Sequence, residues 1–508
     1  MTEVLDGVAN CLRLLAVVQR QHSHPNRVRT HVHTCVGRAK RRADRFDTAT
    51  DRGPSRPRAT GSDRRGGRAE PRRITVNSAS AEPRRVTDAV RVFLRRRGRV
   101  FRPASRGATE EGSEPLEVLV GDVLAGESDP AESARRVVRD ATPRGESELV
   151  RRGKPLSVPV GGTDRTLSPF LFEVAAGGTA DDAPRDPPTA AGEWLPPTAF
   201  LRHTTAPGLW ESYRRVGPDA DLLRTDRTHG AAWLSVRALE ALRDRAGAVA
   251  FGALDGGVDR VAETARELRG ARPSMIVVRH RIDRVLSGAD RAPEAVHDRA
   301  LAGLDAALDA DRLAAERAAA AVAETVGPAA TLSRSGTVAA TLRRVDRPVV
   351  VGESRPGREG VDAAERFAAA GVDATLATDA ALPGLVREGD VGCVLLGADR
   401  ILPSGGVANK VGSYPLALAA ADAGVPAYAV AAADKVATAD EVVRESGDPS
   451  AVYDGDRAVA VENPIFERVP GDLLAGVLTE DGRLDRAAVA ARAAEHESRA
   501  EWTDRWDR

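Results

Sequence analysis

The sequence predicts an α/β protein built around a parallel sheet in its C-terminal part. Two observations predict this sheet. From Ala329 onward, short apolar runs alternate with segments whose apolar residues recur every three or four positions. The short runs are apolar throughout, which is typical of strands covered by helices on both faces. Because 508 residues exceed what one hydrophobic core commonly holds, we expect further domains before the sheet.

Charge is distributed unevenly along the chain. Residues 1–85 hold 19 Lys and Arg against 8 Asp and Glu, and the remainder holds 55 against 66, so the net charges are +11 and −11. The first segment has little apolar periodicity, so we expect a disordered basic segment and not the alternative, a nucleic-acid-binding arm. The acidic remainder indicates a halophilic source, because acidic surfaces stay hydrated in high salt.

Cysteine usage and hydropathy indicate the compartment. Cys11, Cys35 and Cys393 are too few for a disulfide framework, so we expect a reducing cytoplasm. The apolar stretch 11–18 contains Arg13 and is too short to span a bilayer. We therefore expect a cytoplasmic protein that has no membrane partner.

Residues 86–215 are predicted to form a small α+β domain. Strands are expected at 90–94, 116–120 and 170–174, and a hairpin turn is expected at 95–98. A helix is expected over 129–140, because Asp129 can cap its first turn and Pro130 suits the first helical position. A loop rich in Gly, Asp and Pro is expected from 177 to 192.

Residues 226–326 are predicted to be a helical subdomain, 327–485 a Rossmann-like domain, and 486–508 a C-terminal tail helix. The helices expected in the subdomain are 235–246, 258–270, 274–286 and 293–326. The strands expected in the Rossmann-like domain are 329–332, 348–352, 374–377, 392–397 and 426–431. The helices expected between them are 337–344, 361–370, 380–387 and 414–423.

Polar side chains follow each predicted strand of the sheet. The carboxyl ends of parallel strands share one edge, where such folds bind ligands. The residues expected at this edge are Ser333, Arg334, Ser335, Glu353, Arg355, Thr378, Asp379, Asp399, Arg400, Asn409, Lys410, Asp434 and Lys435. Arginines, lysines and small hydroxyls together suit an anion, so the sequence predicts a phosphorylated ligand.

The segment 405–414 is the most specific part of this constellation. Gly405 and Gly406 let the backbone turn and approach a ligand closely. We expect Ser413 to cap the helix that follows, whose free amides favour a phosphate, with Lys410 adding a positive charge.

Asp399 follows an apolar strand, so burial is expected to raise its pKa toward general acid/base use. The structural alternative is that Asp399 forms a salt bridge with Arg355 or Arg400. Cys393 lies inside the same strand and is expected to be an inert core thiol.

Several segments resemble one protein family. Residues 397–401, GADRI, and 405–417, GGVANKVGSYPLA, resemble its signature. The family contains the alpha, beta and delta subunits of translation initiation factor 2B, methylthioribose-1-phosphate isomerase and ribose-1,5-bisphosphate isomerase. Residues 353–356 resemble the family's second motif, and residues 272–275 resemble its helical-domain motif. Residues 463–482 resemble its C-terminal segment. The resemblance covers 229–485 and implies that Arg272 touches a substrate phosphate and that Asp399 is the acid/base group.

By this resemblance, the chain has only one of the two catalytic residues of the family's isomerases. The isomerases pair the aspartate with a cysteine after the first strand, and here Ser333 occupies that position. A serine hydroxyl exchanges protons less readily than a thiol with a pKa of about 8.5. The isomerases' Arg-Gly-Ala motif reads His229-Gly230-Ala231, so one expected phosphate arginine is missing. The initiation-factor subunits also lack the cysteine and act in binding and regulation.

Residues 86–215 resemble a Nudix domain with a degenerate box. The residues at that family's box spacing are Gly121, Glu127 and Arg135. Divalent-cation chemistry needs several carboxylates on one helical face. Arg136 and Arg139 replace two of the three helical acids and leave Asp140. We therefore expect a retained fold that serves binding or packing.

The function favoured at this point is an initiation-factor-2B-like protein that binds a sugar phosphate or nucleotide in a regulatory, non-catalytic role. The alternatives are an aldose–ketose isomerase of a ribose phosphate, with Asp399 and Ser333 as catalytic residues, and a Nudix phosphohydrolase. The expected ligand-binding residues are Gly230, Ala231, Arg272, Arg334, Ser335, Glu353, Arg355, Gly406, Asn409, Lys410 and Lys435. We expect no metal and no cofactor, and a second copy or a related subunit as protein partner.

Overall fold

The computed structural model describes residues 88–104, 115–124, 127, 129–142, 147–160, 163–174, 192–389, 391–442 and 445–507. These residues belong to one compact unit, Pro83–Arg508. The predicted basic segment 1–85 and most of the predicted loop 177–192 lie outside them. No helix in the described ranges combines the length and the apolar character that crossing a bilayer requires.

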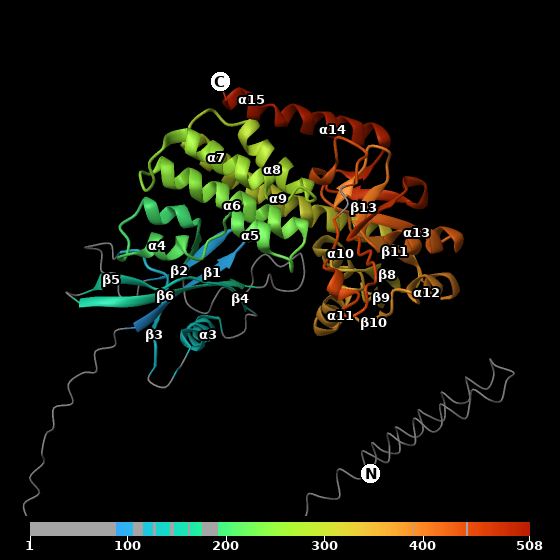
Figure 1. The fold of residues 1–508 in the computed structure, drawn as a ribbon, viewed down its shortest axis with the longest axis horizontal. Helices are drawn as coiled ribbons and strands as arrows, with labels where there is room; N and C mark the ends of the chain where they lie inside the picture. The colour runs from blue at the N-terminus through green and yellow to red at the C-terminus, as the bar shows by residue number, and fades with distance from the viewer. Residues whose placement is uncertain are drawn as a thin grey trace, which may run out of the picture. The chain divides into compact units, whose positions relative to one another are not determined.

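A seven-stranded mixed sheet forms the first part of the described chain (Figure 1). Its strand β1 (Asp88–Arg96) runs parallel to β6 (Thr163–Val174) and antiparallel to β2 (Arg99–Pro103) and β3 (Leu119–Asp122). The other strands are β4 (Ser147–Arg152), β5 (Leu156–Val160) and β7 (Gly192–Leu195). The order is β4-β6-β1-β2-β7, with β3 on β1 and β5 on β6. The helical segments are α3 (Pro130–Ala141), η1 (Pro197–Leu201), α4 (Leu209–Arg214) and α5 (Ala220–Thr225).

Most predicted elements of this region are confirmed. The hairpin turn between β1 and β2 has left-handed backbone at Arg97 and Gly98, with φ of 50° and 73°. The Asp129 carboxylate accepts a hydrogen bond of 3.0 Å from the Ala131 amide and caps α3, as expected. The predicted strand 116–120 is shifted, because Leu116 forms an isolated bridge and β3 begins three residues later.

Four helices form the predicted helical subdomain. They are α6 (Ala231–Ala250), α7 (Gly257–Gly270), α8 (Ile276–Ser287) and α9 (Pro293–Val322). Leu239, Val285 and Ala300 are fully buried where α6, α8 and α9 meet. Each helix lies within a few residues of its predicted range, because apolar recurrence marks the buried face of a helix more clearly than its ends.

The C-terminal sheet is parallel except at one edge, which confirms the predicted fold class. Its order is β10 (Ala374–Ala377), β9 (Val349–Gly352), β8 (Ala329–Leu332), β11 (Cys393–Leu396), β14 (Ala427–Val430), β16 (Gly476–Thr479) and β17 (Gly482–Leu484). Only β17 in this sheet runs antiparallel to its neighbour. The helices that alternate with these strands are α10 (Gly336–Leu342), α11 (Glu359–Ala369), α12 (Leu382–Glu388) and α13 (Ser413–Asp422).

A small antiparallel sheet beside the parallel one has no counterpart in the sequence prediction. It consists of β12 (Arg400–Ile401), β13 (Val407–Lys410) and β15 (Phe466–Val469), with β13 in the middle. The strands β12 and β13 have only two and four residues and lie among Gly, Asn and Lys. The sequence there shows no alternation of apolar residues that would predict a strand. The sequence therefore predicts only a loop where the structure has β12 and β13.

The predicted tail helix is present as two helices, α14 (Arg486–Ala500) and α15 (Trp502–Trp506). Trp502 is fully buried, and its indole N–H donates a hydrogen bond of 2.7 Å to Asp283 on α8. The end of the chain is therefore anchored to the helical subdomain.

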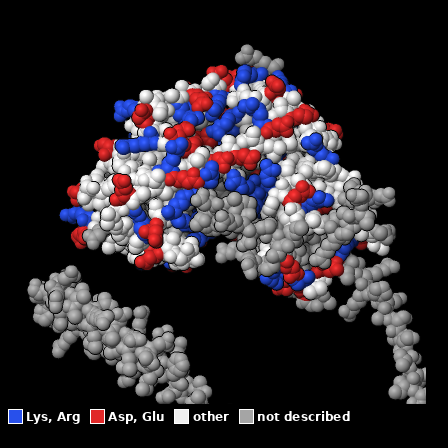
Figure 2. All heavy atoms as spheres, turned by 180° about the vertical axis from the view of Figure 1, so that it is seen from behind, with Lys and Arg blue, Asp and Glu red and all other residues white. Residues whose placement is uncertain are grey.

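Positive and negative side chains are interspersed over the face drawn in Figure 2. Among the described residues, many arginines pair with nearby carboxylates, such as Arg224 with Glu267 and Arg492 with Asp481, both at 2.6 Å. Exposed pairs of this kind contribute little stability each, at most about 1 kcal/mol. Such pairs offset charge locally and leave the acidic excess of residues 86–508 unchanged.

Buried ion pairs join α8 to the turn η2 (Ala433–Lys435) that follows β14. Asp434 is 1% exposed, and its carboxylate contacts the guanidinium groups of Arg281, at 3.1 Å, and Arg284. Arg281 also donates to Ser235 Oγ on α6 at 2.8 Å. This cluster therefore fixes the helical subdomain against the parallel sheet.

Asp434→Asn is expected to lower the free energy of unfolding by about 3–5 kcal/mol, because it leaves two arginines without their buried counter-charge. The measurement is urea unfolding at neutral pH. Asp311→Asn is a matched control, since Asp311 lies at the edge of the same cluster, 3.5 Å from Arg281 and 22% exposed. It should cost no more than about 1 kcal/mol. Equal small losses in both variants would show that the cluster does not hold the two parts together.

Two imidazoles stack beside this cluster. The ring centroids of His280 on α8 and His496 on α14 are 3.8 Å apart, with planes inclined by 12°. Burial, together with neighbouring arginines, lowers the pKa of His280 to about 2 and that of His496 to about 3. His280 Nδ1 lies 2.8 Å from the Asp434 carbonyl, which it can reach only as an N–H donor. Both rings are therefore neutral in the folded chain at physiological pH.

The free energy of unfolding is expected to fall as the pH drops below about 6.5, because there the unfolded chain protonates both imidazoles and the folded chain does not. Each imidazole contributes a slope of up to about 1.4 kcal/mol per pH unit. His496→Phe keeps a stacked ring and removes one titrating group. Urea unfolding between pH 7.5 and 5 should therefore give a shallower slope for this variant, and identical slopes would contradict the assignment.

Candidate active site

The loops that follow the first three strands of the parallel sheet, β8, β9 and β10, are tied together by short hydrogen bonds. The Ser333 amide donates to Ser354 Oγ at 2.6 Å. The Asp379 carboxylate accepts from the amides of Ser354 and Arg355 at 2.7 and 2.6 Å. The predicted gathering of these loops at the carboxyl edge is thus present in the structure.

The loop after β11 joins the same edge through Gly397. A Cβ atom at this position would lie 3.1 Å from Ser335 Oγ and 3.4 Å from Asn409 Oδ1. Ser335 and Asn409, predicted as ligand-binding residues, therefore both lie next to Gly397, two residues before Asp399. Asn409 is buried and donates to Ser413 Oγ at 2.8 Å, which fixes the orientation of its amide.

The Asp399 carboxylate makes no hydrogen bond or ion pair with any described residue. The alternative of a salt bridge to Arg400 is not seen, because the Arg400 guanidinium donates to the carbonyl oxygens of Pro273 and Glu441. Burial raises the pKa of Asp399, and Glu445 raises it further, against the lowering effect of nearby cations. These cations are Lys435, Lys410 and Arg400. Asp399 therefore has the electrostatic character that the sequence predicts.

The two predicted lysines flank Asp399 and have partners of their own. The Lys435 ammonium group donates to the Ala398 carbonyl at 2.6 Å and is buried. The Lys410 ammonium group forms an ion pair of 2.9 Å with Glu359, at the start of α11. Both positive charges are thus held in place at the edge of the sheet.

The helical subdomain contributes the other side of this edge. Arg272 donates to the backbone carbonyl of Asp226 at 2.7 Å. Glu445 influences the pKa of both Arg272 and Asp399, so these two residues face a common neighbour. A Cβ atom on Gly230 would lie 4.0 Å from the Arg334 carbonyl, which places the segment 229–231 beside the loop after β8.

The remaining predicted residues occupy the same loops in different ways. Arg334 forms an ion pair of 3.1 Å with Asp362. Arg355 is exposed, and Glu353 is half-buried, with neither side chain in a hydrogen bond to a described residue. Gly406 approaches protein backbone closely, because a Cβ atom there would lie 2.5 Å from the Val469 carbonyl oxygen. Chain packing thus accounts for a glycine at position 406.

The predicted phosphate site at the start of α13 is occupied by a side chain. Glu467, from β15, accepts hydrogen bonds of 2.7 Å from the amides of Gly412 and Tyr414. Ser413 does not cap the helix as predicted, because its hydroxyl donates to the Lys410 carbonyl. The expectation of free amides at this helix start is therefore wrong, since a carboxylate from a strand distant in sequence satisfies them.

The loop before α6 connects this edge to the N-terminal sheet. The His229 ring stacks on Trp233, with centroids 3.8 Å apart. The Trp233 ring also lies 5.8 Å from the Arg95 guanidinium and 4.8 Å from that of Arg237. Both arginines pair with Glu173 of β6. A residue of the N-terminal sheet, Arg95, thus contacts the same Trp233 ring on which His229 stacks, and this contact supports the segment 229–231.

A model of the initiation factor 2 subunit family matches residues 227–486. This match spans just over half of the chain. The chain belongs to the initiation factor 2 subunit family. The resemblance on which the sequence prediction relied is thereby confirmed, with nearly the same boundaries.

Curated relatives include methylthioribose-1-phosphate isomerases. That of Xanthomonas euvesicatoria pv. vesicatoria is 37% identical over 153 residues, which are 28% of this chain and 43% of the relative. That of Xylella fastidiosa is 36% identical over 175 residues, which are 32% and 48%. The chain thus spans less than half the length of these curated relatives.

Solved structures of the family resemble the chain more distantly. The translation initiation factor eIF-2B of Pyrococcus horikoshii OT3 has a TM-score of 0.46 and 26% identity, covering 52% of this chain and 94% of that one. The 5-methylthioribose 1-phosphate isomerase of the same organism has a TM-score of 0.45 and 19% identity, covering 62% and 90%.

The N-terminal sheet precedes the residues matched to the initiation factor 2 subunit family, and its likeness to a Nudix domain stays a prediction. Gly121 lets α3 approach, since a Cβ atom there would lie 2.3 Å from Val137. Arg136, at a box position expected to be acidic, donates to the Asp122 carbonyl at 2.8 Å. The described residues hold no group of three or more His, Cys, Asp or Glu side chains that could bind a metal ion.

Several residues that shape the site of this family member were not predicted from sequence. They are Glu359, Asp362, Glu445 and Glu467. Acidic residues in helices and edge strands are usually solvated, so their types alone give no signal. Asp379 was placed at the edge from its position after a strand, but its hydrogen bonds to two amides of another loop depend on tertiary contact.

Glu467→Ala is expected to lower the free energy of unfolding by about 1–2 kcal/mol, because it removes the acceptor of two amides at the start of α13. Glu467→Gln retains an acceptor oxygen and should cost less. Urea unfolding of both variants tests the assignment. An alanine variant as stable as the parent chain would show that water or another group replaces the carboxylate.

Proposed function

We propose that this family member is an isomerase that converts an aldose phosphate of the ribose type to the corresponding ketose, with Asp399 as the acid/base group. The observation that carries the proposal is the state of the Asp399 carboxyl. It has no ion pair among the described residues, and burial raises its pKa. Such a carboxyl exchanges protons closer to neutral pH than an exposed aspartate does. The isomerase names of the curated relatives support the same conclusion.

The reaction requires proton movement and no change in overall composition. For a furanose 1-phosphate, the bond between C1 and the ring oxygen breaks, and a hydrogen moves from C2 to C1. The C2 hydroxyl becomes a carbonyl, and its proton ends on the former ring oxygen. A single carboxyl that takes up and returns a proton can serve these transfers, which is the role we assign to Asp399.

The cations around Asp399 provide the binding of the phosphate group in this proposal. Arg272, Arg334 and Lys410 now contact carbonyl or carboxylate oxygens, which are the contacts that a phosphate can replace. Ser335 and Asn409 offer neutral hydrogen-bonding groups beside Gly397. An arrangement with charges around the rim and neutral donors near Asp399 suits a sugar phosphate.

One observation favours a second candidate, a regulatory protein that binds a sugar phosphate or nucleotide without converting it. Ser333 stands where the family's isomerases have a cysteine, and its hydroxyl makes no hydrogen bond to a base among the described residues. Its backbone has a left-handed φ of 59°, which the loop tolerates through the hydrogen bond from its amide to Ser354. Without an activating partner, a serine hydroxyl is a poor acid/base group at neutral pH.

Incubation of the protein with methylthioribose-1-phosphate or ribose-1,5-bisphosphate, followed by NMR, should show formation of the ketose. Asp399→Asn should reduce the rate at least about 100-fold, the usual contribution of a general acid/base group. Because the pKa of Asp399 is raised, the rate should fall with decreasing pH earlier than for an exposed aspartate. Ser333→Cys should increase the rate by restoring a thiol.

Asp346→Asn is the matched control, because Asp346 is an exposed residue just before β9, at the amino edge of the same sheet. It should leave the rate unchanged. Binding of either sugar phosphate without any ketose would decide for the regulatory candidate. Turnover that survives in Asp399→Asn would remove Asp399 from its assigned role.

A further inference from the structure

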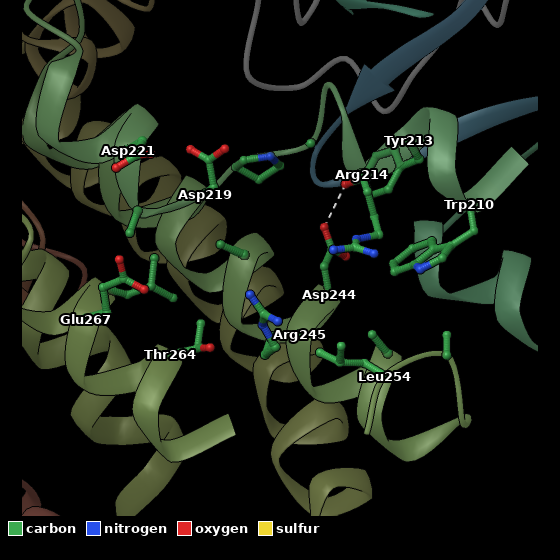
Figure 3. Close-up of a pocket in the computed structure, with 17 residues that line it drawn as sticks. Trp210, Tyr213, Arg214, Asp219, Asp221, Asp244, Arg245, Leu254, Thr264 and Glu267 are labelled. Carbon is green, nitrogen blue, oxygen red and sulfur yellow. Dashed lines mark hydrogen bonds between the residues drawn. The ribbon is translucent and has the colours of Figure 1, made fainter. Parts of the chain in front are cut away.

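A second pocket lies away from the parallel sheet, among α4, α5, α6 and α7 (Figure 3). Its volume is about 290 Å³, near the lower end of the range for small-molecule sites. Trp210 and Arg214 line it from α4, Arg245 from α6 and Thr264 from α7. The pocket thus opens where the segment after the N-terminal sheet meets the helical subdomain.

The acidic residues of this pocket are already paired with arginines. Asp219 pairs with Arg151, Asp221 and Glu267 with Arg224, and Asp244 with Arg243, at 2.6–2.7 Å. Asp244 also accepts a hydrogen bond of 2.8 Å from the Tyr213 hydroxyl, as Figure 3 shows. Three arginines outside the pocket lining thus pair with its four carboxylates, and Arg224 pairs with two of them.

Two arginines of the pocket have no such partner. Neither Arg214 nor Arg245 forms a hydrogen bond or ion pair with a described residue, and both line the pocket (Figure 3). Burial lowers the pKa of Arg245, and the positive charges of Arg260 and Arg214 lower it further. Glu267 and Glu263 offset this only in part. Like charges that face a common space are stabilised by an anion between them.

Trp210 contributes an aromatic side chain to the pocket lining. Its side chain is 7% exposed, and its indole N–H is closed off from solvent, with no hydrogen-bond partner among the described residues. The N–H is therefore not available to a ligand. The pocket thus combines two guanidinium groups without partners with one aromatic side chain.

We propose that this pocket binds a small phosphate monoester. The oxygens of a phosphate can accept hydrogen bonds from Arg214 and Arg245, and guanidinium groups are well suited to phosphate geometry. The volume leaves room for a sugar or nucleoside beyond the phosphate. The site is separate from the edge of the parallel sheet, so the proposal does not depend on the proposed function.

Calorimetric titration of the full chain tests the site, with inorganic phosphate, ribose 5-phosphate and adenosine 5′-monophosphate as separate probes. We expect at least one monoester to bind more tightly than inorganic phosphate. Arg214→Gln with Arg245→Gln should weaken that binding at least tenfold. Lys410→Ala, at the edge of the parallel sheet, should leave it unchanged.

The substituted arginines have no partners to lose, so the double variant should melt at the same temperature as the parent chain when no probe is added. The monoester should raise the melting temperature of the parent chain and not that of the double variant. No binding of any monoester, or binding that the double variant retains, would overturn the proposal. So would binding that is lost in Lys410→Ala alone, because it would place the phosphate at the other site.

Discussion

The contact of Asp434 with Arg281 and Arg284 is the interaction on which the candidate site depends. It lies between the helical subdomain and the parallel sheet, and every group involved is largely buried. Lys435, the next residue, donates to the carbonyl of Ala398 and thereby lies beside Asp399. A buried ion pair adds less stability than apolar packing of equal size. The planar guanidinium group, however, donates its hydrogen bonds in set directions, and it therefore fixes how the two parts are oriented. The position of the acid/base candidate is therefore set by how the two parts meet.

Carboxylates shape most of the edge around Asp399. Asp379 holds the loop after β9, Glu467 holds the start of α13, and Asp362 and Glu359 hold the cations Arg334 and Lys410. An incoming phosphate must compete with these internal acceptors for the arginine and the lysine. The affinity for a phosphate at this edge is then the difference between the cation–phosphate contact and the internal cation–carboxylate contact. Selectivity depends on a geometry that only the correct ligand satisfies.

The parallel sheet and its edge could be predicted because continuous apolar strands and strand-end polarity are local signals. The five strands β8, β9, β10, β11 and β14, and the placement of Ser335, Asn409 and Asp399 together, follow from that rule. The occupied start of α13 could not be predicted, since Glu467 reaches it from β15, more than fifty residues later in the chain. Asp434 was expected at the edge, but its pairing was not, because its partners come from a helix about 150 residues earlier. Local pattern thus reveals strands and loops, and long-range side-chain contacts decide which of their polar groups are free.

The helix α6 contacts three parts of the molecule, namely the edge of the parallel sheet, the N-terminal sheet and the pocket. It begins beside His229 at the edge of the sheet, carries Arg237 and Glu240 against Arg95 and Glu173 in its middle, and presents Arg245 to the second pocket. Its 20 residues form a stiff rod of about 30 Å. A shift of α6 along its axis would therefore displace residues at the edge of the parallel sheet and in the pocket together, and residues of the N-terminal sheet contact the helix between these two places.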